Sequence, residues 1–135
     1  MPVTKLNSPG ALFNIQVTSD SLESLFKESL LYVMKTLHPG RGKTEMIERE
    51  VQLTSINPTT LLIDFLNEIL SLTHVYHEVY SDVEIIDFTG KNIRIKLKGC
   101  AIVNFDRDIK GLAYYDPRIT RSESGNWVTK LTVEM

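Results

Sequence analysis

The segment from Asn57 to Leu72 constrains the fold of this chain most, because it combines a clear helix start with an unbroken apolar stripe. Asn57 can accept hydrogen bonds from the free amides of a first helical turn, and Pro58 suits the first helical position. The apolar residues then recur at the spacing of one helical face. They are Leu61, Leu62, Phe65, Leu66, Ile69 and Leu70. Asp64 and Asn67 lie largely off this stripe, so the pattern predicts an amphipathic helix with a polar side.

A second helix is predicted from about residue 20 to residue 37. Asp20 suits the N-cap, and Glu23 follows at the spacing of a capping box. Apolar residues repeat every three or four positions up to Leu37. His38-Pro39-Gly40 then ends the helix, because proline disfavours helical geometry in the residue before it.

Most of the remaining chain alternates between apolar and polar residues, as strands do. The predicted strands cover residues 11–18, 45–54, 78–88, 92–98, 109–116 and 126–134. Residues 1–10 contain two prolines and are expected to be irregular or flexible. The fold class is therefore α+β, with two helices packed on a mostly antiparallel, possibly mixed, β-sheet in a single domain spanning residues 11–135.

Composition excludes several classes of protein. With 135 residues and a formal charge of −2, the chain can bury one core and has no bulk attraction for nucleic acid or membranes. A single cysteine, Cys100, excludes an internal disulfide and a cysteine-based zinc site. No apolar run approaches the roughly 20 residues of a membrane span, and the first residues lack the apolar core of a signal peptide. We expect a cytoplasmic protein.

Candidate chemistry is sparse. Arg94, Lys96 and Lys98 alternate along one predicted strand, so they share a face that could meet RNA phosphates or simply be solvated. Neither a phosphate-binding loop nor a nucleophile–base pair is evident in the sequence. These observations favour a protein that is not an enzyme over a hydrolase.

Four stretches resemble the archease family, small proteins that activate the GTP-dependent RNA ligase of tRNA splicing. TLLIDFLNEILSL (60–72) resembles the second helix of the family, and SDSLESLFKESLLYVM (19–34) resembles the first. GCAIVNFDRDIKGLAYYD (99–116) resembles a "GEPFD…EVKAVTYH" region, and NWVTKLTVEM (126–135) resembles the terminal strand. In the third stretch the matching positions are Gly99, Phe105, Asp106, Lys110, Ala113 and Tyr115. The four stretches occur in the family order from about residue 11 to residue 135.

The resemblance implies an accessory factor that promotes guanylylation and turnover of an RNA ligase of the tRNA-splicing type, and so associates indirectly with tRNA. Lys110 stands where the family has a lysine needed for ligase activation. The family also implies a divalent cation, Ca²⁺ or Mg²⁺, bound between an aspartate near the start of the chain and the penultimate aspartate.

The implied cation site is altered in this sequence. Leu12 occupies the position of the first aspartate, and Glu134 occupies that of the penultimate one. Because these ions bind oxygens and gain affinity with each carboxylate, Glu134 and the expected terminal carboxylate of Met135 would form a weak site at most. Two hypotheses follow: an archease-like activator that acts through Lys110 and Glu134, or a degenerate archease-fold scaffold, without cation-dependent activation, that associates with RNA through its basic strand.

Overall fold

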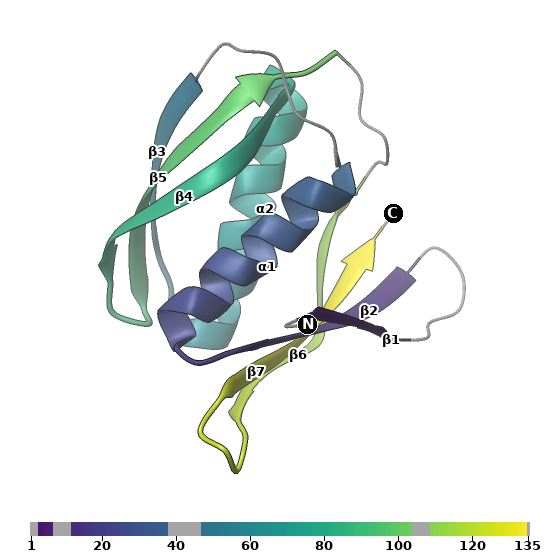
Figure 1. Cartoon of the computed structure of the whole chain (residues 1–135), viewed down its shortest axis with the longest axis vertical. Coiled ribbons are helices and arrows are strands. Elements are labelled where there is room, and N and C mark those ends of the chain that lie inside the picture. Colours follow the sequence, from purple (N-terminus) through teal and green to yellow (C-terminus); the bar gives the residue numbers. More distant parts are fainter. Residues whose placement is uncertain (1–2, 7–11, 38–46, 104–108, 135) are drawn as a thin grey trace.

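The structure, a computed structural model, describes residues 3–6, 12–37, 47–103 and 109–134. The chain alternates strands and helices before it ends in four strands (Figure 1). The elements are β1 (Val3–Leu6), β2 (Leu12–Ser19), α1 (Leu22–Leu37), β3 (Ile47–Thr54), α2 (Pro58–Tyr76), β4 (Glu78–Phe88), β5 (Asn92–Ala101), β6 (Gly111–Arg121) and β7 (Trp127–Glu134). Each predicted helix and strand is present in the structure. Strands β5 and β6 extend further along the chain than predicted.

The strands form two sheets rather than the single sheet expected from the sequence. One sheet has the order β1-β2-β7-β6, and the other has the order β3-β5-β4. All strand pairs among the described residues are antiparallel. Each helix contacts strands of both sheets, so the two helices lie between them (Figure 1). The α+β class is confirmed, and the mixed-sheet alternative is not seen in the described strands.

Both helices begin with a side-chain cap. The Asn57 side chain accepts a hydrogen bond from the Thr60 amide at 2.8 Å, as predicted for α2. In α1 the cap is Ser21, whose hydroxyl accepts from the Ser24 amide at 3.0 Å, and not the predicted Asp20. Ser21 is the cap because it directly precedes the first helical residue, Leu22, and its short side chain reaches the free amides of the first turn.

A strand lies within the first ten residues, where the composition predicted irregular structure. Val3–Leu6 form β1, which pairs antiparallel with β2 from Val3↔Val17 to Leu6↔Asn14. The expectation that residues 1–10 are irregular is therefore wrong for this strand. The free edge of β2 supplies backbone partners that local composition does not reveal.

The core lies where the helices meet the sheets. Phe26 of α1 packs against Phe65 of α2 with ring centroids 5.6 Å apart, and against Phe88 of β4 at 5.1 Å. The leucines and isoleucines of the α2 stripe are buried, as its periodicity predicts. In the part of the chain that the structure describes, neither helix has both the length and the apolar character needed to cross a membrane.

Candidate functional site

Three residues that the resemblance singled out meet at one end of the β1-β2-β7-β6 sheet. Glu134 of β7 is in register with Leu12 of β2 on one side and with Gly111 of β6 on the other. The backbone N–H of Lys110 donates to the carbonyl of Glu134 at 2.8 Å. We call Leu12, Lys110 and Glu134 the strand-end site. The antiparallel pairing of β2, β7 and β6 thus brings together positions that are distant in the sequence.

The two charged members of this site face solvent. The side chains of Lys110 and Glu134 are both exposed, so a partner can reach them. An ammonium and a carboxylate on neighbouring backbone can form charge-assisted hydrogen bonds with groups of opposite charge. Met135, Phe105 and Asp106 lie outside the described residues, and the part predicted for Met135 stays a prediction.

The described residues do not fit a tight divalent-cation site. Among them, no three His, Cys, Asp or Glu side chains are placed to hold a metal ion. Leu12, in register with Glu134, has no side-chain oxygen to offer a hard cation. Asp20 follows the far end of β2, about 26 Å from Leu12 at the rise of a strand, so it cannot replace the missing carboxylate. The cation prediction therefore depends on Glu134 and on groups outside the described part.

Asn67 of α2 contacts the strand next to the site, a contact that sequence analysis did not predict. Its side-chain oxygen accepts from the Leu112 amide at 2.8 Å, and its side-chain nitrogen donates to the Leu112 carbonyl at 3.1 Å. The sequence signal was present: Asn67 is a polar residue within an apolar helix. Its partner could not be named without the packing of α2 on β6.

The predicted basic strand lies in a mixed-charge surface. On β5, Arg94, Lys96 and Lys98 are flanked across both neighbouring strands by exposed carboxylates. The flanking residues are Glu48 and Glu50 on β3, and Asp82, Glu84 and Asp87 on β4. Arg94 forms an ion pair with Glu50, and the Lys98 ammonium lies 3.9 Å from Glu48. We call these eight residues the charged sheet face; its carboxylates outnumber its cations.

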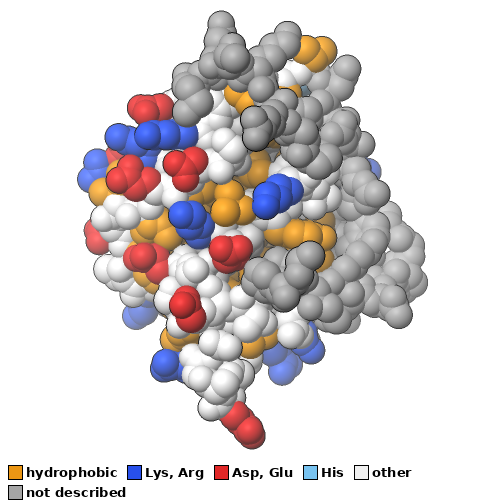
Figure 2. All heavy atoms as spheres, viewed as in Figure 1, with side chains coloured by type: hydrophobic (Ala, Val, Ile, Leu, Met, Phe, Trp, Pro, Cys, Tyr) orange, Lys and Arg blue, Asp and Glu red, His pale blue; other side chains and the backbone are white. Residues whose placement is uncertain are grey.

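Figure 2 agrees with this description, because acidic and basic side chains intermingle on the side of the molecule formed by the β3-β5-β4 sheet. Phosphate groups of RNA are attracted by clustered positive charge and repelled by carboxylates. The charged sheet face therefore attracts RNA phosphates much less than Arg94, Lys96 and Lys98 would without these carboxylates.

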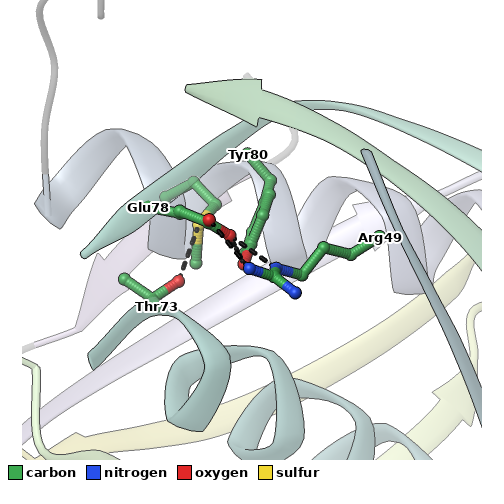
Figure 3. A network of polar contacts seen from close by, with 5 residues as sticks. Arg49, Thr73, Glu78 and Tyr80 are labelled. Atoms are coloured by element: carbon green, nitrogen blue, oxygen red, sulfur yellow. Dashed lines mark hydrogen bonds and ion pairs between the residues drawn. The ribbon is translucent and has the colours of Figure 1, made fainter. Parts of the chain in front are cut away.

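A polar network joins the β3-β5-β4 sheet to the end of α2 (Figure 3). Arg49 donates two hydrogen bonds to Glu78, from Nε at 2.7 Å and from Nη2 at 3.0 Å. The hydroxyl of Tyr80 donates to the same carboxylate at 2.8 Å, and the Arg49 guanidinium lies 3.8 Å from the Tyr76 ring centroid. Arg49, Glu78 and Tyr80 lie in strands that were predicted, whereas Tyr76 lies beyond the predicted end of its helix at Leu72. The contacts among these residues were not predicted.

The network holds Glu78 in its charged form. The hydrogen bonds from Arg49 lower the pKa of Glu78, the Tyr80 hydroxyl lowers it further, and burial opposes both. Burial is the main cause that raises the pKa of Tyr80, and the bond to Glu78 adds to it. A bidentate arginine–carboxylate pair with a third donor is a stable crosslink, so this cluster has a structural role.

Comparison with known proteins finds relatives of similar length. The Archease protein family (MTH1598/TM1083) matches residues 11–134. Protein archease of Thermococcus gammatolerans is 28% identical over 122 residues, which cover 85% of this chain and 86% of that protein. Protein archease of Pyrococcus abyssi is 27% identical over 125 residues, covering 86% and 87% respectively.

Two solved structures share the fold. Protein 1598 of Methanobacterium thermoautotrophicum superposes with a TM-score of 0.71 at 17% identity, covering 99% of each chain. An archease from Thermotoga maritima, described as a possible chaperone, gives a TM-score of 0.67 at 15% identity and covers 96% of this chain and 98% of that one. With a family match over nearly its whole length, this chain belongs to the archease family.

Proposed function

We propose that this protein is an accessory factor that activates an RNA ligase of the tRNA-splicing type. In this role it docks on the ligase and promotes guanylylation and turnover, with Lys110 and Glu134 at the contact. The factor itself makes and breaks no bond; the ligase carries the chemistry.

One observation supports this proposal above the others. The strand register and the Lys110–Glu134 backbone hydrogen bond bring Lys110, which matches the family lysine, and Glu134, which stands in place of the family aspartate, to one exposed end of a sheet. A lysine ammonium can bind a phosphate as a point charge. Glu134 can accept hydrogen bonds from donors of the ligase, so the pair can orient a segment that carries both kinds of group.

Leu12 favours a second candidate function. Because the described residues do not fit a tight cation site, the protein can be a scaffold that keeps the archease fold without cation-dependent activation. An RNA-binding form of this scaffold is opposed by the carboxylates of the charged sheet face. The two candidates differ in whether Lys110 matters for ligation.

Multiple-turnover RNA ligation by the ligase of the same organism separates them. We expect the protein to increase the rate of turnover, and we expect Lys110→Met to remove most of that increase. Lys130→Met is the matched control, because Lys130 is an exposed lysine on β7, about 13 Å from Glu134 along the strand. No increase with the folded wild-type protein, or an equal increase with Lys110→Met, would support the scaffold.

A further inference from the structure

The contact between Asn67 and Leu112 closes an open sheet edge beside the strand-end site. β6 is an outer strand of the β1-β2-β7-β6 sheet, so no described strand neighbours it on one side. Asn67 bonds both backbone polar groups of Leu112, accepting from its N–H and donating to its carbonyl. These are the groups that a neighbouring strand would otherwise bond. A side-chain amide of α2 therefore takes the place of a strand at this point.

This contact requires a close approach between helix and strand. A Cβ atom at Gly111 would lie 3.2 Å from the Asn67 side-chain oxygen, tighter than usual van der Waals contact. Glycine at this position thus allows Asn67 to reach Leu112. Asn67 is in turn held by its helix, since its neighbour Leu66 is fully buried in the core.

The backbone that carries Lys110 is consequently held from two directions. The Lys110 amide donates to the Glu134 carbonyl of β7, and Leu112, two residues later, is bound by Asn67 of α2. Loss of the second anchor would leave the N–H and carbonyl of Leu112 without their partner on α2, and this end of β6 would then be held by β7 and by the buried side chains of Ile109 and Leu112. The position of the Lys110 side chain relative to Glu134 would then be less well defined.

We infer that Asn67 is a positioning residue for ligase activation: by binding Leu112 from α2, it fixes Lys110 beside Glu134 in the geometry that the ligase contacts. This inference rests on the proposed function. The inference can be tested separately from that function, because Asn67 acts by ordering the backbone, whereas Lys110 contacts the ligase directly.

The test compares Asn67→Ala, Asn67→Asp and Thr73→Val with the wild-type full-length protein in the ligation assay, over a range of protein concentrations. Thr73→Val is the matched control, because Thr73 is a buried polar residue of the same helix that bonds Met34, away from β6. Amide hydrogen exchange of Lys110 and Leu112 is followed by NMR in each variant.

We expect Asn67→Ala to lower the maximal increase in ligation rate about tenfold, because small displacements of functional groups cause rate losses of this size or more. The half-saturating concentration should change less than about threefold, because the contact surface itself is kept. The Leu112 amide should exchange faster in Asn67→Ala. Asn67→Asp keeps an acceptor for this amide but places a carboxylate oxygen against the Leu112 carbonyl, so its maximal rate should also fall below that of the wild type.

Two results would overturn the inference while leaving the proposed function intact. The first is a full maximal rate in Asn67→Ala with faster exchange at Leu112, which would make Asn67 a cover for the sheet edge alone. The second is an equal loss in Thr73→Val, which would trace the effect to general stability. A wild-type protein that does not stimulate the ligase would overturn the proposed function and this inference with it.

Discussion

At the scale of single residues, Leu12 sets the chemistry of the strand-end site. It is in register with Glu134, and directly paired residues of antiparallel strands have Cβ atoms about 5 Å apart. An aspartate in its place would put a second carboxylate within reach of a cation held by Glu134. With leucine at position 12, Glu134 is the one described carboxylate at this pair of positions. This explains why the sequence predicts a weak cation site.

We therefore predict that Leu12→Asp raises the affinity for Ca²⁺ at least about tenfold, because each added carboxylate strengthens a calcium site. Isothermal titration calorimetry of the wild type and the variant measures this change. Leu12→Asn is the control, since it adds an oxygen without charge and should gain much less. Equal affinities in the wild type and Leu12→Asp would show that the cation, if bound, lies elsewhere.

Gly99 is another residue whose identity is dictated by its surroundings. A Cβ atom there would lie 2.0 Å from the Val79 carbonyl oxygen, which is backbone and cannot move aside. We predict that Gly99→Ala lowers the free energy of unfolding by about 3 kcal/mol, at the upper end of overpacking effects. Urea unfolding measures the change.

Gly125→Ala provides the comparison. Gly125 has open space around it but a φ of +89°. Its replacement by alanine should therefore lower the free energy of unfolding by only roughly 1 kcal/mol, the strain of an L-residue in the left-handed region. A smaller loss for Gly99→Ala than for Gly125→Ala would contradict the close approach of β4 and β5.

At the scale of elements, the Arg49–Glu78–Tyr80 network fixes the junction of β3, β4 and the end of α2. Because the pKa of Glu78 is lowered in the folded protein, its charged form adds stability at pH values above the unfolded pKa of about 4.3. This contribution is lost as the pH falls through the folded pKa.

Thermal unfolding between pH 7 and about pH 3 should therefore show a steeper loss of Tm with acid in the wild type than in Glu78→Gln. The two proteins should differ most near neutral pH and converge at low pH. Glu84→Gln removes an exposed carboxylate from the same strand and serves as the control for net charge. Parallel curves for the wild type and Glu78→Gln would contradict the pKa shift.

Elements were easier to predict from the sequence than their partners. The N-cap and the apolar stripe of α2 and the alternation in β5 are local signals, so the positions of these elements followed from the sequence. The pairing of β1 with β2 and the division into two sheets depend on contacts between distant segments, which periodicity does not encode. The same holds for the site: the resemblance identified Lys110 and Glu134, but the Asn67–Leu112 contact needed the packing of α2 on β6.

At the scale of the whole molecule, two sheets enclose two helices and present different surfaces. The strand-end site lies on one sheet, and the charged sheet face lies on the other. The net charge is −2, and carboxylates flank the basic residues of β5 on both neighbouring strands, so the described part of the β3-β5-β4 sheet presents no broad positive surface. This arrangement opposes the binding of RNA phosphates to the charged sheet face.

We accordingly predict that the protein alone binds tRNA with a Kd no tighter than about 100 µM at physiological salt, which is the weak end of the range of non-specific binding. Replacing Arg94, Lys96 and Lys98 by alanine together should change this value less than about threefold. Fluorescence anisotropy with labelled tRNA measures both. Tight binding that the triple variant abolishes would restore the RNA-associated scaffold as the better account.

The most direct test of the central claim is a double-mutant cycle at the strand-end site, read in multiple-turnover ligation. If Lys110 and Glu134 act as a unit on the ligase, Lys110→Met and Glu134→Gln should each remove most of the rate increase. The double variant should then lose little more than the worse single variant. A fully active Lys110→Met protein, or losses that simply add, would contradict a joint role for the two residues.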